Sequence, residues 1–144
     1  MLTGCVIIMD LDKFEELSKS RGWSEYVPNI ITGTLTTLVW QFVRKHFAMV
    51  IYGLDEKRGT EEVVLEIPDI SEKDLEEIIE DLERIRMEIS RLGASISIAV
   101  ALGPVTGKPA KNRREAYNSY TRKRALKLLR EVKRAGGNKV AVTH

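Results

Sequence analysis

Hydrophobic positions follow two patterns along the chain, and together these patterns predict strands and helices in a mixed order. Short apolar runs rich in branched residues are typical of buried strands, whereas apolar residues three and four positions apart are typical of helices. On this basis we predict strands at residues 4–11, 47–52, 62–67, 95–102 and 139–142. We predict helices at residues 13–20, 29–46, 71–92 and 114–135.

Residues that begin or end helices and strands bound these elements. Ser71 followed by Asp74 is a capping signature at the start of the third helix, and Gly93 is expected to end that helix. Pro68 is expected to end the third strand. The connection 53–61 has a glycine near each end, which suits a hairpin between the second and third strands.

The order of these elements predicts the fold. A strand, two helices, a hairpin, a helix, a strand, a helix and a last strand make the split β-α-β arrangement. We therefore predict an α+β, ferredoxin-like fold with helices mainly on one face or on both faces of the sheet. Residues 4–11 should pair with residues 62–67 at the centre of the sheet. The length of 144 residues suits a single domain spanning residues 1–144.

Composition excludes several classes of protein. The hydrophobic fraction of 43% is typical of a globular protein. Cys5 is the only cysteine, so no disulfide can form within the chain and a zinc site would lack its usual thiolates. No apolar segment approaches the roughly 18 residues of a membrane helix, so we expect a cytoplasmic protein that does not bind membranes. The scarcity of Asn and Gln beside many charged residues is typical of heat-adapted proteins.

Charge is unevenly distributed along the chain. Residues 107–144 contain 12 basic and 2 acidic side chains, whereas residues 71–92 contain 4 basic and 8 acidic ones. A cationic segment of this size suits the phosphates of a nucleotide or of a nucleic acid. It equally suits the acidic helix, either within the fold or across a homodimer.

Two aspartates directly follow the first apolar run. Asp10 and Asp12 lie two positions apart, so they point the same way while strand geometry lasts. Two carboxylates at that separation repel unless a cation lies between them or one is protonated. The alternative is that Asp12 caps the helix that begins at residues 13–14, while Asp10 is a solvated strand end.

Acidic residues of the hairpin are the expected partners of this strand end. In the predicted topology, Asp10 and Asp12 approach Glu61 or Glu62, although Asp55 and Glu56 could reach the same place if the register differs. Other chemistries lack their residues. His46 and His144 are the only histidines, which excludes a Ser-His-Asp triad, and residues 103–108 are too short for a phosphate-binding loop.

Three motifs resemble a known family. The segment Val6-Ile7-Ile8-Met9-Asp10-Leu11-Asp12-Lys13-Phe14 is similar to the opening Asp-x-Asp-x-Phe strand of the palm-like domain of GGDEF diguanylate cyclases. Class III nucleotidyl cyclases, CRISPR polymerase palms and the archaeal type III GTP cyclohydrolase share this domain, as do small archaeal proteins. Residues 59–63, Gly-Thr-Glu-Glu-Val, resemble the Gly-Gly-Asp/Glu-Glu-Phe hairpin, and residues 132–138 resemble the closing Ala-Lys-x-x-Gly-Arg-Asn.

The resemblance implies a Mg²⁺ or Mn²⁺ site and a purine nucleoside triphosphate as the ligand. The metal ligands would be Asp10, the Leu11 carbonyl, Asp12 and Glu61 or Glu62. Asp10, Glu61 and Glu62 would be the catalytic acids. Lys133 would contact phosphate, and the alternative is a solvated cation at a helix end. Apart from the resemblance, small polar side chains at the start of the second helix, Asn29 and Thr32, would suit a phosphate or base, and the alternative is a loosely wound first turn without a ligand.

Departures from the family leave the activity open. Thr60 replaces the second glycine of the hairpin motif. The base-contacting asparagine expected after Phe14 is absent. Ser18 lies near that place in the sequence, and Asn29 could substitute for the asparagine. We therefore consider three functions. The first is a metal-dependent enzyme that cyclises, transfers or hydrolyses a nucleotide. The second is a non-catalytic palm that senses a nucleotide or dimerises. The third is a basic nucleic-acid-binding module.

Overall fold

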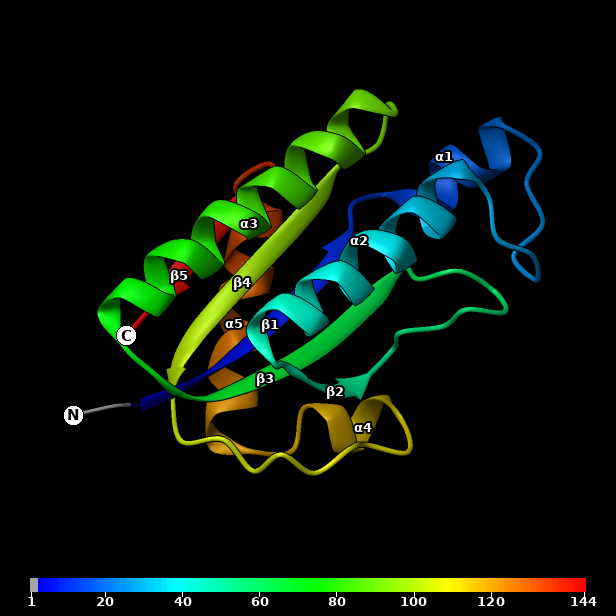
Figure 1. The fold of residues 1–144 in the computed structure, drawn as a ribbon. Coiled ribbons are helices and arrows are strands. Elements are labelled where there is room, and N and C mark those ends of the chain that lie inside the picture. Colours follow the sequence, from blue (N-terminus) through cyan, green and yellow to red (C-terminus); the bar gives the residue numbers. More distant parts are fainter. Residues whose placement is uncertain (1–2) are drawn as a thin grey trace.

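A five-stranded sheet in the order β2-β3-β1-β4-β5 forms the centre of the molecule (Figure 1). The structure, a computed structural model, describes residues 3–144. The strands are β1 (Thr3–Leu11), β2 (Met49–Tyr52), β3 (Glu62–Ile70), β4 (Ile96–Gly103) and β5 (Val140–Thr143). β1 pairs antiparallel with both β3 and β4, and β5 is parallel to β4. The predicted central pairing of β1 and β3 is confirmed.

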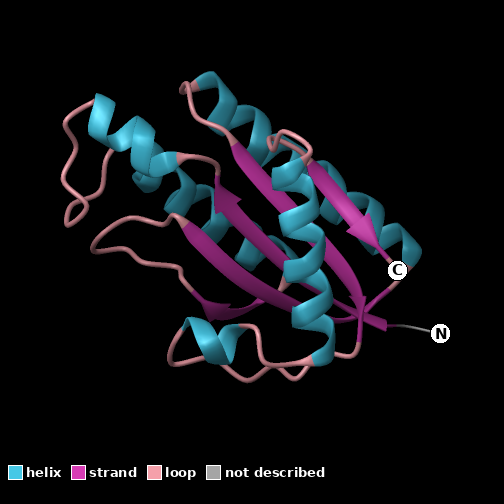
Figure 2. Cartoon of the chain, turned by 180° about the vertical axis from the view of Figure 1, so that it is seen from behind, coloured by secondary structure: helices cyan, strands magenta, loops and turns pink. Residues whose placement is uncertain are grey.

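Helices cover both faces of this sheet. They are α1 (Phe14–Ser20), α2 (Ile30–His46), α3 (Glu72–Arg91), α4 (Arg113–Ala116) and α5 (Tyr120–Arg134). α2 and α3 lie on one face in Figure 1, and α5 crosses the other face, which Figure 2 shows from behind. The predicted α+β, ferredoxin-like fold is confirmed, with helices on both faces.

Burial on both faces explains the continuous apolar run of β1. Ile7 and Met9 face the core beneath α2 and α3. Val6 and Ile8 face the second core, which includes Leu129 of α5. A strand covered on both sides cannot alternate apolar and polar residues, so its polar residues are confined to its end. The two aspartates therefore come where the covering layers stop.

Strand β3 does not end at Pro68, contrary to the prediction. The strand continues to Ile70, and its register with β1 shifts between the pairs Cys5–Ile67 and Thr3–Ile70. Asp69, directly after the proline, has a φ of 52°. Proline is tolerated at such a bulge because no ladder hydrogen bond is required from its nitrogen.

The predicted helix over residues 114–135 is two helices, α4 and α5. α4 begins at Asn112, whose side chain accepts a hydrogen bond from the Glu115 N–H. The Ser119 hydroxyl accepts the Arg122 N–H and begins α5 as a new helix. These two caps redirect the chain, and α4 consequently lies against the β2 side of the sheet rather than along α5.

A buried ion pair fixes α5 and the preceding loop to the sheet. Arg122 Nε lies 2.9 Å from Glu66 Oε2, and the two side chains are 5% and 0% exposed. Glu66 Oε1 accepts the Gly107 N–H, and Arg122 donates to the Lys108 carbonyl. Arg122 is therefore an internal residue of the basic segment, not part of its surface.

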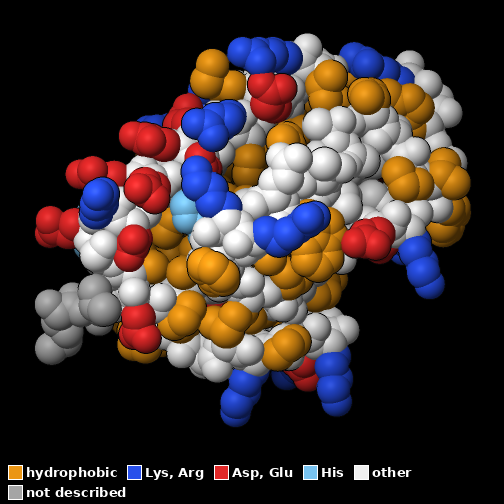
Figure 3. Space-filling view, in the orientation of Figure 1, with side chains coloured by type: hydrophobic (Ala, Val, Ile, Leu, Met, Phe, Trp, Pro, Cys, Tyr) orange, Lys and Arg blue, Asp and Glu red, His pale blue; other side chains and the backbone are white. Residues whose placement is uncertain are grey.

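Acidic α3 and basic α5 lie on opposite faces of the sheet, so the two helices do not neutralise each other within the fold (Figure 1). Figure 3 shows the acidic side chains gathered over α3. The ion pairs of α3 connect it to Lys45 and His46 of α2 and to its own arginines. Pairing of α3 with α5 inside one chain is therefore excluded as an explanation of the charge pattern.

Candidate functional site

The end of β1 meets the beginning of β3, as the topology predicts. Asp10 lies directly opposite Glu62 in the antiparallel ladder, and the Leu11 N–H donates to the Glu61 carbonyl at 3.0 Å. Side chains of directly opposed residues share one face of a sheet, so the carboxyl groups of Asp10 and Glu62 are neighbours. Asp55 and Glu56 are not in this position, which settles the register of the hairpin.

Asp10 lies in a half-buried, strongly charged environment. Burial raises the pKa of Asp10 to about 6, and the nearby carboxylates of Glu62 and Asp12 add to this increase. Lys133 and Arg113 act in the opposite direction. A carboxylate that is poorly solvated and faces a second carboxylate is one whose ionised form a further cation would stabilise.

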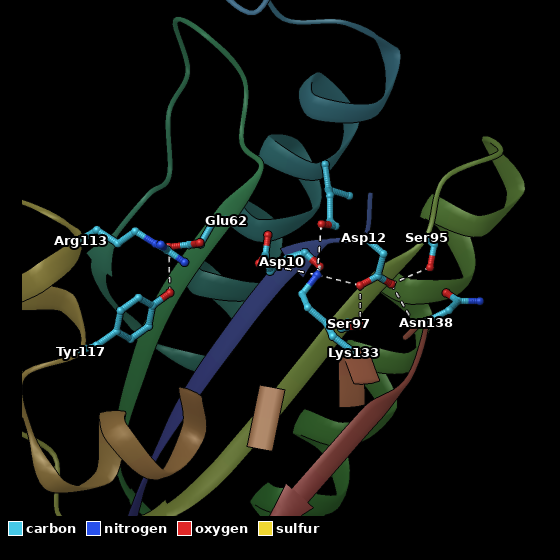
Figure 4. A network of polar contacts seen from close by, with 10 residues as sticks. Asp10, Asp12, Glu62, Ser95, Ser97, Arg113, Tyr117, Lys133 and Asn138 are labelled. Carbon is cyan, nitrogen blue, oxygen red and sulfur yellow. Dashed lines mark hydrogen bonds and ion pairs between the residues drawn. The ribbon is translucent and has the colours of Figure 1, made fainter. Parts of the chain in front are cut away.

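Asp12 is held by a dense set of donors. Its two oxygens accept hydrogen bonds from the Ser95 hydroxyl at 2.6 Å, the Ser97 hydroxyl at 2.7 Å, the Asn138 N–H at 2.9 Å and Lys133 Nζ at 2.7 Å (Figure 4). Burial raises the pKa of Asp12, but the hydrogen bonds from Lys133 and the two serines outweigh burial and leave the pKa below its usual value.

The alternative role of Asp12 as a helix cap is wrong. The N-cap of α1 is Lys13, which adopts the left-handed conformation with a φ of 47°, and no side chain caps this helix. Asp12 turns toward β4 and toward the segment after α5 instead. Gly137 makes this approach feasible, because a Cβ at that position would lie 2.7 Å from Asp12 Oδ2.

Lys133 places its ammonium among oxygens of the β1 end. It lies in the last turn of α5, and Nζ is 2.7 Å from Asp12 Oδ1, 3.3 Å from the Leu11 carbonyl and 3.5 Å from the Asp10 carbonyl. The distance from Nζ to Asp10 Oδ2 is 3.6 Å. Figure 4 shows the ammonium between the two aspartates.

Two residues that the sequence analysis did not single out complete the other side of the site. Arg113 Nε and the Tyr117 hydroxyl both donate to Glu62 Oε1, at 3.0 and 2.8 Å (Figure 4). Burial and the adjacent Glu62 carboxylate raise the pKa of Tyr117. The only signal in the sequence was the basic charge of Arg113. Its place could not be deduced, because it depends on the break between α4 and α5.

Glu61 lines two cavities. One, of about 370 Å³ at the end of the molecule where α1 lies, also contains Arg58 and the aromatic rings of Phe14 and Trp23. The other is lined by Glu62 and Arg113 as well. Burial raises the pKa of Glu61, and Arg58 opposes this effect. Of the two neighbouring glutamates of the hairpin motif, only Glu62 lies in β3 and opposite Asp10 in the ladder.

Asn29 and Thr32 line the first of these cavities and form the capping box of α2. Asn29 Oδ1 accepts the N–H groups of Ile31 and Thr32, and the Thr32 hydroxyl accepts the Asn29 N–H at 3.0 Å. Thr32 is 2% exposed. These hydrogen bonds explain both side chains as helix caps, and ligand binding by them stays a prediction.

The hairpin connection is ordered by its own hydrogen bonds. Asp55 Oδ1 accepts the N–H groups of Lys57 and Arg58. Thr60 is fully buried, and its hydroxyl lies 2.7 Å from the Thr36 hydroxyl beneath α2. Gly59 has a φ of +87°, and a Cβ there would meet Thr32 Oγ1 at 2.2 Å. Thr60 is therefore directed into the core and not toward Glu62.

The four predicted carboxylates do not form one cluster. Across residues 3–144, no group of three or more His, Cys, Asp and Glu side chains is arranged to hold a metal ion. Asp10 and Glu62 remain as a facing pair, with the Leu11 carbonyl beside them.

Within residues 3–144, no helix is both long and apolar enough to cross a membrane.

Several cations of the basic segment are already committed to contacts within the chain. Arg122 pairs with Glu66, Arg113 with Glu62, and Lys133 with Asp12. Arg124 donates to the Leu102 carbonyl. Residues 107–144, with 12 basic and 2 acidic side chains, have a net charge of +10. Because several of these cations are already paired, this net charge overstates the positive surface that a nucleic acid would meet.

No protein-family model matches the sequence, and no curated protein matches it. Solved structures do match the fold. The diguanylate cyclase SiaD from Pseudomonas aeruginosa, solved with its activator SiaC, has a TM-score of 0.59 and 16% identity. A bacterial light-regulated adenylyl cyclase has a TM-score of 0.60 and 11% identity. A chain of the Csm1–Csm4 cassette, solved in complex with AMPPNP, has a TM-score of 0.55 and 13% identity.

These matches span nearly the whole of this chain but only part of the others. They cover 99%, 99% and 96% of this chain and 50%, 76% and 20% of the diguanylate cyclase, the adenylyl cyclase and the cassette chain. Identities this low establish the fold alone. Residues 3–144 thus share the fold of the matching parts of the diguanylate cyclase, the adenylyl cyclase and the Csm1–Csm4 cassette chain.

Proposed function

We propose that this palm domain binds a purine nucleoside triphosphate together with Mg²⁺ or Mn²⁺ at the end of β1. The observation that supports this most directly is the facing pair of carboxylates, Asp10 and Glu62, beside the ammonium of Lys133. The match to two nucleotide cyclases and to a chain solved with AMPPNP supports the same ligand class.

The donor set fits a hard divalent cation. Mg²⁺ prefers oxygen ligands and is usually held by one or two carboxylates plus the phosphates of a substrate. Asp10, Glu62 and the Leu11 carbonyl would supply the protein oxygens. The Lys133 ammonium, 3.3 Å from the Leu11 carbonyl, indicates that a positive charge is accommodated here. A bound cation would neutralise charge that develops on the α-phosphate.

Cationic and aromatic residues around this pair suit the remainder of a nucleotide. Lys133 and Arg113 would contact phosphates. The cavity lined by Asn29 and Thr32 would take the base, because it also presents Phe14 and Trp23, whose ring centroids are 6.2 Å apart. Glu61 would face the base rather than the phosphates. The reaction would be cyclisation, nucleotidyl transfer or ring hydrolysis of GTP, and the alternative is nucleotide sensing without turnover.

Isothermal titration with GTP and ATP, each with and without Mn²⁺, tests the proposal. We expect binding that requires Mn²⁺ and that falls at least about tenfold in Asp10→Asn, a loss typical even of residues that only support metal ligands. Glu80→Gln removes the same charge from an exposed position of α3, on the face of the sheet opposite α5, and should bind like the wild type. Chromatography of the incubated nucleotide separates an enzyme from a sensor. Failure of every nucleoside triphosphate to bind would refute the proposal.

A further inference from the structure

The ammonium of Lys133 already occupies the environment that a divalent cation would need. Its Nζ contacts the carbonyls of Asp10 and Leu11 and lies 3.6 Å from Asp10 Oδ2. A magnesium ion requires oxygens at about 2.0 to 2.1 Å. Two cations sharing the oxygens of Asp10 and Leu11 would repel each other strongly in a half-buried site. Metal binding and the present position of Lys133 therefore compete.

Asp12 holds Lys133 in this position. The Asp12 carboxylate is fixed by the two serine hydroxyls of β4 and by the Asn138 N–H. It accepts the shortest contact of the ammonium, at 2.7 Å. Since these donors turn Asp12 toward β4, it contributes to the site through Lys133, as a positioning residue.

We infer that Lys133 is a built-in counter-ion of the site, anchored by Asp12, and that a divalent cation binds tightly only when a triphosphate draws the ammonium away from Asp10 and Leu11. This inference rests on the proposed function, because it names the order of events at the same site. A phosphate offers Lys133 a new anionic partner, which frees the oxygens of Asp10 and Leu11. Metal and nucleotide must then strengthen each other's binding by the same factor.

Direct Mn²⁺ titration, followed by the electron paramagnetic resonance signal of the free ion, tests this without any turnover. Without nucleotide, we expect Lys133→Met to bind Mn²⁺ about 5- to 150-fold more tightly than the wild type, the usual range of a coupling between two ligands. Lys133→Arg keeps a cation and should bind Mn²⁺ as weakly as the wild type. Lys127→Met removes an exposed lysine from the same helix and should also match the wild type.

Asp12→Asn distinguishes an anchor from a metal ligand and provides a second test should Lys133→Met fail to fold. If Asp12 anchors Lys133, its loss weakens the hold on the ammonium and Mn²⁺ binds more tightly. If Asp12 is itself a metal ligand, Mn²⁺ binds more weakly and the inference is overturned. The inference is also overturned if Lys133→Met folds but leaves the Mn²⁺ affinity unchanged.

Adding a non-hydrolysable analogue of GTP or ATP completes the experiment. The analogue should increase the Mn²⁺ affinity of the wild type strongly and that of Lys133→Met much less. Should neither analogue bind while Lys133→Met still shows tighter Mn²⁺ binding, the proposed function fails and the assignment of Lys133 stands. Should both analogues bind and increase the Mn²⁺ affinity of wild type and variant equally, the assignment fails and the proposed function stands.

Discussion

Helix α5 brings a cation to the same face of the sheet at each of its ends, and the two resulting ion pairs differ in exposure. At the start of α5, Arg122 and Glu66 are 5% and 0% exposed and lie 2.9 Å apart. At its end, Lys133 and Asp10 are 30% and 24% exposed and lie 3.6 Å apart. We call Arg122–Glu66 the sealed pair, because both side chains are buried, and Lys133–Asp10 the open pair, because both side chains are partly exposed to solvent.

The number of further donors explains this difference. Both oxygens of Glu66 accept hydrogen bonds, from Arg122 and from the Gly107 N–H. Arg122 also donates to the Thr106 hydroxyl and to the carbonyls of Lys108 and Glu115. Asp10 instead faces Glu62, another carboxylate, across the ladder. The sealed pair, whose two side chains are buried and hydrogen-bonded within the chain, stabilises the fold but leaves no group accessible to a ligand. The open pair has excess negative charge and can bind one.

Breaking the sealed pair should have the largest effect. Arg122→Met leaves Glu66 buried without its counter-ion, which should lower the free energy of unfolding by about 3 to 5 kcal/mol. Urea unfolding followed by circular dichroism measures this loss.

A double variant provides the control for this prediction. Arg122→Met combined with Glu66→Leu removes both charges and should recover much of the stability, since an apolar replacement of a buried pair is often neutral. A double variant no more stable than the single one would contradict the idea that an unpaired buried charge causes the loss.

A third carboxylate, Asp81 on α3, tests the comparison at intermediate exposure. It lies 2.6 Å from His46 and 2.8 Å from Lys45 of α2, and its side chain is 11% exposed. Asp81→Asn should lower the free energy of unfolding by about 1.5 to 3 kcal/mol, the range for hydrogen bonds to a charged group. Exposed Glu80→Gln on the same helix should change it by less than about 0.5 kcal/mol.

The pH dependence of the Asp81 effect has a defined sign. Burial raises the pKa of Asp81, but the hydrogen bonds from Lys45 and His46 outweigh burial and keep the pKa below its ordinary value of 3.8. Folding therefore favours the ionised form. The contribution is complete above the ordinary pKa and is lost as the pH falls through the lowered one. Urea unfolding should show the full difference between wild type and variant at pH 5 and a shrinking one below pH 4. A difference that grows in acid would contradict this assignment.

The sequence was sufficient where the evidence was local or topological. The apolar run of β1 predicted a doubly covered strand, the capping pair Ser71 and Asp74 predicted the start of α3, and the order of elements predicted that Asp10 would meet the hairpin. Each of these follows from residues near one another in the chain or from the few topologies that a split β-α-β order allows.

Contacts between distant segments could not be deduced in the same way. Asp12 is bonded to Ser95 and Ser97, more than 80 positions away, so an aspartate that could have capped α1 became an anchor for Lys133. Arg122 looked like a surface cation because its partner Glu66 lies 56 positions earlier. Only Glu62 of the two adjacent acids of the hairpin motif lies opposite Asp10 in the ladder, and the motif alone did not distinguish the two.

Among the three ion pairs, the open pair should have the smallest effect on stability. Lys133→Met removes a partly exposed ammonium, and Asp12 keeps its hydrogen bonds from Ser95, Ser97 and the Asn138 N–H. The free energy of unfolding should therefore fall by about 1 kcal/mol, the upper end of the range for exposed ion pairs, because the pair is only partly exposed. Urea unfolding beside Arg122→Met measures both ends of α5 under one condition. Equal losses at the two ends would mean that Lys133 is a structural residue, and the open pair would then have no feature that distinguishes it from the sealed one.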